Sequence, residues 1–198
     1  MRADDLCPLG AVFAKDEGYV LSRYEADEAD HYAFLQAMEE AAPGSILLKD
    51  ENYMKNSWKE ALASDETLQL KVTDKRTKAY VGYVMLQHLD TREPELGIQL
   101  LQGYQHQGIG SRVMRLFVER LRMLLDIDYF YVRIKSDNYA SQRLFEGMGA
   151  VTIGEEGSEY TELMRNLMEE MGREAFEAAI QGKFEQTQRY IICYMLKA

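Results

Sequence analysis

The sequence predicts an α/β (α+β) fold in which helices flank a mixed central sheet. Three observations support this prediction. Residues 95–125 pass from an apolar-rich strand through a glycine-containing turn into an amphipathic helix. Before that stretch, segments of alternating apolar and polar residues are joined by short turns, which is typical of antiparallel strands. After it, strand patterns and helix patterns alternate.

The elements before this stretch are placed by periodicity and turn residues. Residues 15–18 form a turn, Pro43 and Gly44 end a helix, and Trp58 is expected to anchor the next helix by packing. In chain order we expect a hairpin at 11–24, helices at 26–40 and 53–63, and strands at 65–74, 79–89 and from 95 onward. The short turns argue against a dinucleotide-binding fold, which needs helical crossovers from its first strand.

The central helix is expected to turn one apolar face to the core, formed by Val113, Leu116, Phe117, Leu121, Leu124 and Leu125. After it we expect a strand at 128–135, a helix from Tyr139 closed by Gly149, a strand from 150 to 154, a helical and Glu-rich segment at 158–183, and a last strand at 189–197. We interpret the chain as a single domain over residues 1–198, with a helical insertion at about 158–186 before the last strand.

The turn between the central strand and helix is suited to binding a phosphate. Gly108 and Gly110 allow unusual backbone dihedrals, and the first helical N–H groups have no partner inside the helix. A nucleotide P-loop would need Lys and then Ser or Thr where Ser111 and Arg112 follow the last glycine, and a dinucleotide fingerprint would need glycine where Val113 stands. A plain tight turn between strand and helix stays an alternative.

Two blocks of sequence resemble the GNAT acyltransferase family. Residues 105–110, Gln-His-Gln-Gly-Ile-Gly, resemble its pyrophosphate-binding motif Gln/Arg-x-x-Gly-x-Gly/Ala. Residues 138–150 resemble its Asn-x-x-(Ser/Ala)-x-x-Leu-(Tyr)-x-x-x-Gly-(Phe) block. The two blocks in this order are much more specific than either alone. The resemblance implies the GNAT acyl-CoA N-acyltransferase fold and acetyl-CoA as the acyl donor.

The resemblance also implies how the donor is held. Backbone N–H groups of the glycine turn bind the pyrophosphate, and a bulge leaves backbone groups near Leu100 and Leu101 free for the pantetheine arm. Arg112 adds charge to the phosphates or is a solvated helix residue, and Asn138 contacts the donor or only caps its helix. The implied donor-binding residues are Leu100, Leu101, Gln105, Gln107, Gly108, Ile109, Gly110, Ser111, Arg112, Asn138, Ser141 and Phe145.

Transfer of an acyl group to an amine needs a base for the amine proton and stabilisation of the thioester oxyanion. Glu95 is the candidate base, because it opens the strand that leads into the turn and acids near this place often serve the family. A solvated Glu at a strand start is the alternative. His106 lies in the turn, but no orienting carboxylate is evident, so loop packing or solvent exposure is favoured over catalysis.

The general acid is the point at which the sequence departs from the family. The second block commonly has Tyr where this chain has Phe145, which carries no hydroxyl. Tyr139 is the nearest tyrosine and the candidate donor of the proton, although a surface aromatic at a helix start is the simpler interpretation. Water is the second option. The third is that no acid is needed, because a free thiol has a pKa of about 8.5 and its thiolate leaves readily near neutral pH.

The composition limits the classes of molecule that the protein is expected to bind. The net charge is −10, which argues against a nucleic-acid surface and favours neutral or cationic small molecules. Cys7 and Cys193 have neither metal-ligand nor redox spacing, so reduced thiols and no metal are expected. The N-terminal residues lack the pattern of a signal peptide, and no stretch is long enough to span a membrane. We therefore expect a cytoplasmic protein without membrane or nucleic-acid partners.

The acidic insertion is interpreted as a helical decoration packed on the sheet or in the seam of a homodimer. A lid whose acids recruit a cationic amine is the sharper hypothesis. For the whole chain we predict an N-acetyltransferase that moves an acetyl group to an amine of a small molecule or peptide by direct attack in a ternary complex. A non-catalytic acyl-CoA-binding or sensing module is the alternative, made credible by Phe145, and an interaction protein that uses the acidic helices is a third class.

Overall fold

A computed structural model of the protein describes residues 2–157 and 190–198. Contacts divide the chain into two compact units, Met1–Phe130 with Lys197–Ala198, and Tyr131–Leu196. The predicted helical insertion at 158–186 lies outside the described residues. A single domain over the whole chain stays a prediction.

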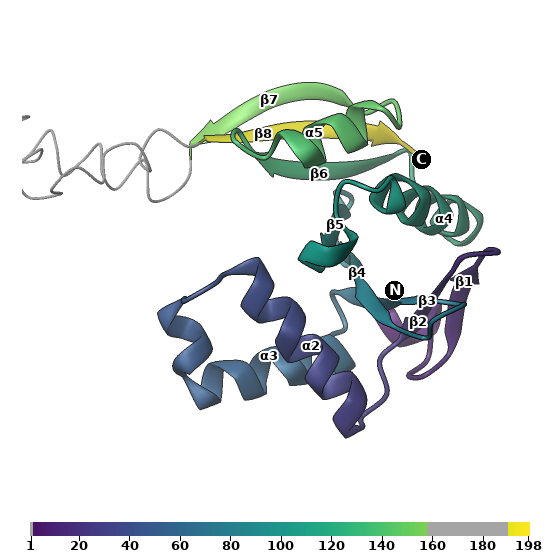
Figure 1. Ribbon diagram of the computed structural model, residues 1–198. Helices are drawn as coiled ribbons and strands as arrows, with labels where there is room; N and C mark the ends of the chain where they lie inside the picture. The colour runs from purple at the N-terminus through teal and green to yellow at the C-terminus, as the bar shows by residue number, and fades with distance from the viewer. Residues whose placement is uncertain (1, 158–189) are drawn as a thin grey trace, which may run out of the picture. The chain divides into compact units, whose positions relative to one another are not determined.

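The first unit contains an antiparallel meander of five described strands (Figure 1). They are β1 (Val12–Lys15), β2 (Tyr19–Arg23), β3 (Leu68–Asp74), β4 (Tyr80–Gln87) and β5 (Glu95–Leu100), paired in that order. The predicted hairpin and meander are confirmed. The first turn closes because Asp16 Oδ1 accepts hydrogen bonds from the N–H groups of Gly18 and Tyr19 at 2.7 and 2.8 Å.

Helices α2 (Glu28–Ala41) and α3 (Glu51–Ala63) lie together beside these strands (Figure 1). The carboxylate of Asp50 accepts from the N–H groups of Asn52 and Tyr53, so α3 begins two residues before the predicted Tyr53. Trp58 is the expected anchor: its ring lies 5.6 Å from that of Tyr24 and 5.3 Å from that of Phe34.

Helix α4 (Ile109–Leu124) packs against β1, β4 and β5. Val113, Phe117 and Leu121 are fully buried, as their spacing predicts. The apolar face differs from the prediction at its end: Leu124 is 37% exposed, and Leu125 is buried but lies just after the last helical residue.

Three short elements have no counterpart in the sequence-based predictions. They are α1 (Ala3–Leu6) and the 3₁₀ turns η1 (Ile46–Lys49) and η2 (Gln102–Tyr104). Each comprises about one turn, which is too short for helical periodicity to mark it.

The second unit contains β6 (Tyr129–Lys135), α5 (Tyr139–Glu146), β7 (Val151–Gly157) and β8 (Tyr190–Lys197). The strand order is β6, β8, β7, and β7 pairs antiparallel with β8. The prediction that a left-handed Gly149 closes the helix is confirmed, because the N–H groups of Gly149 and Ala150 donate to the carbonyls of Glu146 and Phe145 at 2.9 and 3.0 Å, as in a Schellman cap. Helix α5 ends at Glu146, and Gly149 takes its left-handed φ of 94° in the turn that leads to β7.

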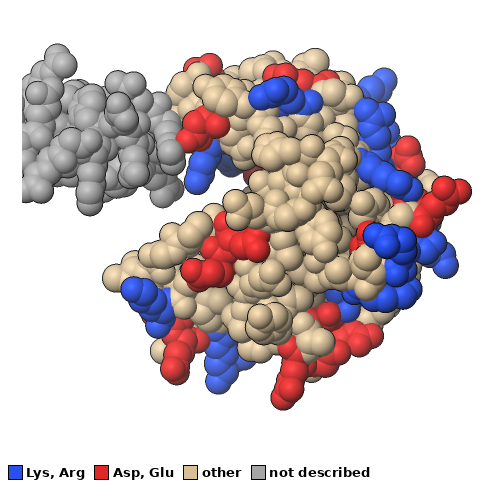
Figure 2. All heavy atoms as spheres, in the orientation of Figure 1, with Lys and Arg blue, Asp and Glu red and all other residues tan. Residues whose placement is uncertain are grey.

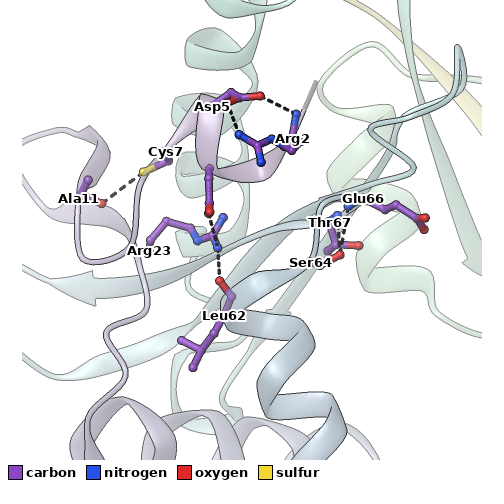
Figure 3. A network of polar contacts seen from close by, with 10 residues as sticks. Arg2, Asp5, Cys7, Ala11, Arg23, Leu62, Ser64, Glu66 and Thr67 are labelled. Carbon is purple, nitrogen blue, oxygen red and sulfur yellow. Dashed lines mark hydrogen bonds and ion pairs between the residues drawn. The ribbon is translucent and has the colours of Figure 1, made fainter.

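One cation is enclosed in the first unit (Figure 3). The side chain of Arg23 is 0% exposed, donates to the Leu62 carbonyl at 2.5 Å, and has a carboxylate oxygen of Asp4 at 3.4 Å. Its Nε and Nη1 have no hydrogen-bond partner among the described residues. Burial lowers the pKa of Arg23, and Asp4 acts in the opposite direction.

Candidate functional site

The junction of β5 and α4 is the predicted glycine turn. Gly108 precedes the helix with φ 75° and ψ −2°, a left-handed conformation that glycine adopts without steric cost. The first hydrogen bond inside α4 runs from the Arg112 N–H to the Gly108 carbonyl at 3.2 Å. In the described part of the chain, the N–H groups of Ile109, Gly110 and Ser111 therefore have no acceptor.

The space above this turn is open. A Cβ atom built on Gly108 would meet no heavy atom within 4 Å. The side chain of Ile109 points into the core, where the residue is 8% exposed, so Ile109 offers only its backbone amide. Unpaired N–H groups and the positive end of the helix dipole share this open space, an arrangement that suits an anion.

Two glutamine side chains brace the turn from within. Gln105 Nε2 donates to the Leu100 carbonyl at 2.8 Å, and Gln107 Nε2 donates to the Gly103 carbonyl at 2.7 Å. Their amides hold the backbone in the structure, whereas the sequence predicted donor contacts for both residues. His106 is exposed and has a left-handed φ of 58°, which agrees with its assignment to solvent.

The side chain of Arg112 binds the first hairpin, whereas the sequence offered it as a contact of the phosphates. Its Nε donates to Asp16 Oδ2 at 2.5 Å, and its guanidinium carbon lies 5.4 Å from the centre of the Tyr19 ring. A Cβ on Gly18 would lie 3.2 Å from that guanidinium, so the glycine makes room for it. The pKa of Arg112 is raised, chiefly by the hydrogen bond to Asp16. Arg112 ties α4 to the first hairpin, and a contact with phosphate stays a prediction.

The backbone at the end of β5 differs from the expected free edge. The Leu101 N–H donates to the Val81 carbonyl and the Leu101 carbonyl accepts from the Tyr104 N–H, both at 2.9 Å. The register of β4 and β5 is regular up to the pair Gly82 and Leu100. The expectation of free backbone groups at Leu101 is therefore wrong for this structure. The Leu100 carbonyl accepts from two side-chain amides, those of Gln105 and, at 3.2 Å, Gln99.

Glu95 begins β5 opposite Gln87 of β4. Its side chain is only 17% exposed, and Oε2 lies 4.0 Å from His88 Nε2. His88 itself has a left-handed φ of 58°, which turns the chain as it leaves β4. The predicted base is thus partly enclosed and faces an imidazole, and it is not the solvated acid of the alternative interpretation.

The face of the sheet that carries Glu95 also carries Gly97, since alternate strand residues share a face. A Cβ on Gly97 would lie 2.5 Å from the Met85 methyl group, so Met85 lies across the bare backbone at this point. Tyr83 lies on the same face of β4. The pKa of Tyr83 is raised, chiefly by burial and to a smaller extent by the nearby Tyr53 of α3. The alternation of β4 was a signal in the sequence that could have placed Tyr83 and Met85 on the face of the sheet that carries Glu95.

Helices α2 and α3 differ in charge. Helix α2 carries acids and no Lys or Arg, whereas α3 carries residues of both signs, and Figure 2 shows acidic and basic side chains where Figure 1 labels α3. On the face that this view shows, the described residues form no continuous basic surface of the kind that binds nucleic-acid phosphates.

A family model described as "Acetyltransferase (GNAT) domain" matches residues 2–151. The chain belongs to the GNAT acetyltransferase family. The resemblance inferred from the two sequence blocks is therefore confirmed, and the protein is an acyltransferase of this family. No curated protein matches the sequence.

Solved GNAT structures share the fold. Ribosomal-protein-S18-alanine N-acetyltransferase from Escherichia coli is 16% identical over 90% of this chain and 93% of its own, with a TM-score of 0.59. A GNAT acetyltransferase from Bacillus anthracis is 13% identical over 93% and 97%, with a TM-score of 0.65. Spermidine N-acetyltransferase from Vibrio cholerae, in complex with CoA and spermine, is 15% identical over 92% and 96%, with a TM-score of 0.62. These likenesses confirm the predicted fold class.

The second GNAT block lies in the second unit. Asn138 caps α5, since its side chain accepts from the Ser141 N–H at 3.2 Å, so the predicted cap is confirmed. Tyr139 is 62% exposed at the helix start. Phe145 is 2% exposed and belongs to the core of this unit, so its ring is not available to a donor in this structure. The apolar spacing of α5 was the signal for that burial.

None of the helices in residues 2–157 and 190–198 has the length and apolar composition that crossing a bilayer requires.

Proposed function

We propose that this GNAT protein is an N-acetyltransferase that moves an acetyl group from acetyl-CoA to an amine of a small molecule or a peptide by direct attack in a ternary complex. The observation that supports the proposal best is the open row of backbone N–H groups from Gly108 to Ser111. By their names, similar structures act on spermidine and on a ribosomal-protein alanine, and both acceptors are amines. The cytoplasm is the proposed location, and no metal is required.

For the donor, the main chain does most of the binding. The amides from Gln107 to Ser111 hold the pyrophosphate, while the Gln105 side chain keeps the turn in shape. Leu100 is the proposed contact of the pantetheine arm, because its carbonyl accepts from side-chain amides that can move away. Asn138 and Ser141 stay proposed contacts from the second block.

For the chemistry, Glu95 is the proposed base. The acceptor nitrogen attacks the thioester carbonyl carbon, its proton passes to the Glu95 carboxylate directly or through water, and the carbon–sulfur bond breaks to release the thiolate. The partly enclosed carboxylate, with His88 Nε2 at 4.0 Å, supports this role for Glu95. Tyr139 is a candidate to protonate the thiolate, and its exposed hydroxyl makes water an equal candidate.

The test is turnover with a panel of amines, with release of the CoA thiol and the mass of the product as readouts. Glu95→Gln should lower kcat at least about 100-fold, the lower end of the contribution that a positioned base makes, and leave CoA affinity unchanged. Glu93→Gln, an exposed acid two residues earlier, is the matched control and should behave as wild type. CoA binding without acetylation of any amine would replace this proposal with the acyl-CoA-binding module.

A further inference from the structure

Helix α2 ends beside the loop that follows strand β5. Glu40, one residue before the end of α2, accepts a hydrogen bond through Oε2 from the backbone N–H of Gln102 at 2.5 Å. The two residues are 62 positions apart in the sequence. Gln102 is the first residue of η2, the short turn that leads to Gly108. This contact therefore joins α2 to the start of the proposed donor loop.

The other hydrogen bonds of the loop are local. The N–H groups of Tyr104 and Gln105 donate to carbonyls three residues back, and the two glutamine amides described above bond within the loop or to the end of β5. Among the described residues, Glu40 is the one hydrogen-bond partner of residues 102–108 that lies outside residues 100–112. In the part of the chain that the structure describes, a single carboxylate supplies the hydrogen bond that joins this loop to α2.

The position of Glu40 in its own helix disfavours a negative charge. The carbonyl end of a helix carries partial negative charge, and the last turn of α2 contains no basic residue. An acid there weakens the helix slightly. The bond to Gln102 offers a physical reason for its presence that lies outside the helix.

We propose that Glu40 is a positioning residue of the donor site. Its carboxylate fixes the start of the loop, so that the amides from Gly108 to Ser111 are in place before the donor binds. Without that bond the loop must be ordered when the donor binds, and the entropy lost in ordering it weakens affinity. This inference rests on the proposed function, because it assigns Glu40 to the same donor site.

The first test compares two replacements of Glu40. Glu40→Ala removes the hydrogen-bond acceptor, and we expect CoA affinity by calorimetry to fall about tenfold, which corresponds to about 1.4 kcal/mol. The KM for acetyl-CoA should rise by the same factor, while kcat at saturating donor stays within about twofold of wild type. Glu40→Gln keeps an oxygen acceptor and should retain most of the affinity. Glu39→Ala, on the exposed side of the same helical turn, is the control and should change neither quantity.

The second test removes the donor of the bond from the loop. Gln102→Pro deletes the backbone N–H, and the preceding Leu101, with φ −58° and ψ 146°, already has the conformation favoured before proline. We expect the same tenfold loss of affinity (about 1.4 kcal/mol), and the double variant with Glu40→Ala should lose little more. Gln102→Ala keeps the N–H and is the control. This variant keeps the test available if Glu40→Ala fails to fold.

The outcomes separate cleanly. Wild-type CoA affinity in Glu40→Ala or in Gln102→Pro would overturn the inference and leave the proposed function intact. Equal losses in Glu40→Gln and Glu40→Ala would also overturn it, because the charge and not the acceptor would then matter. If wild-type protein binds no CoA, the proposed function fails, and the role of Glu40 fails with it.

Discussion

The turn from Gly108 to Ser111 and the side chain of Arg23 both hold N–H donors that lack acceptors among the described residues, and they differ in their access to solvent. At the turn from Gly108 to Ser111 the backbone donors face open space. At Arg23 the guanidinium is 0% exposed, and its Nε and Nη1 lie in the interior. An open unpaired donor is bonded to water and can exchange it for a ligand, whereas a buried one pays the full cost of desolvation. The first arrangement therefore indicates binding, and the second lowers stability.

Arg23 is tolerated because its surroundings offset part of that cost. Asp4 supplies a carboxylate from α1. The end of α3 supplies the Leu62 carbonyl, which Figure 3 shows beside Arg23. Cys7 lies close enough that Arg23 lowers the pKa of its thiol, although burial has the larger and opposite effect and the pKa is raised. The thiol therefore stays neutral near pH 7 and does not compensate the guanidinium.

The largest predicted effect falls on the open region. Gly108→Asn should reduce CoA affinity at least about 100-fold, or about 2.7 kcal/mol, because its side chain would occupy the space that the pyrophosphate needs. Asn tolerates positive φ better than other residues, and a Cβ at this position meets no neighbour, so the variant should fold. Calorimetric titration with CoA, together with the melting temperature, checks both statements.

Gly103→Asn is the matched control, since a Cβ on Gly103 also meets nothing within 4 Å and its φ is not left-handed. It should change CoA affinity far less than Gly108→Asn. Equal losses in the two variants would mean that general disturbance of the loop, and not access to the amides at Gly108, controls binding.

A smaller effect is predicted in the buried region, on folding alone. Asp4→Asn leaves the Arg23 guanidinium without its carboxylate and should lower the free energy of unfolding by about 1–2 kcal/mol, less than for a fully buried pair because Asp4 is 59% exposed. Chemical denaturation measures this change. The CoA affinity of this variant should equal that of the wild type.

The second replacement in this region is not expected to lower the free energy of unfolding. Arg23→Met removes the charge, keeps much of the volume, and should be neutral or stabilising. In that background Asp4→Asn should have almost no effect. A full loss of stability from Asp4→Asn in the Arg23→Met background would show that Asp4 acts through the α1 helix and not through the guanidinium.

The smallest effect concerns Arg112, which adjoins the open region but bonds to the hairpin. Burial acts to raise the pKa of Asp16, and the hydrogen bonds from Arg112, Tyr19 and Gly18 outweigh it, so the pKa is lowered. The stability that Asp16 contributes is therefore present above the ordinary carboxyl pKa of about 3.9 and is lost as the pH falls through the lower folded pKa.

Arg112→Gln should therefore reduce the free energy of unfolding slightly near neutral pH and have less effect at about pH 3. Denaturation at both pH values measures the difference. CoA affinity should change little. A loss of affinity as large as that in Gly108→Asn would return Arg112 to the phosphate-binding role that the sequence predicted.

The sequence predicted those features that depend on neighbouring residues. The hairpin at Asp16, the helix that follows Gly108 and the cap at Asn138 each follow from local spacing and turn chemistry. The family resemblance was also local, since each of its two blocks is a short run of residues.

The sequence did not predict contacts between distant residues. Arg112 and Asp16 are 96 positions apart, and Glu40 and Gln102 are 62 apart, so no local pattern marks either pair. The hydrogen bonds of Leu101 depend on how β4 and η2 meet it, and this is set by tertiary packing. The burial of Phe145 could have been read from the apolar face of its helix. The family motif directed attention to its missing hydroxyl instead.

The central claim is that main-chain amides at Gly108–Ser111 hold a pyrophosphate. Calorimetry with CoA, dephospho-CoA and pantetheine tests it most directly, because only the first two carry that group. We predict that dephospho-CoA binds within about tenfold of CoA and that pantetheine binds at least about 100-fold more weakly, a difference of about 2.7 kcal/mol. No heat with CoA, or pantetheine binding as tightly as CoA, would contradict the account.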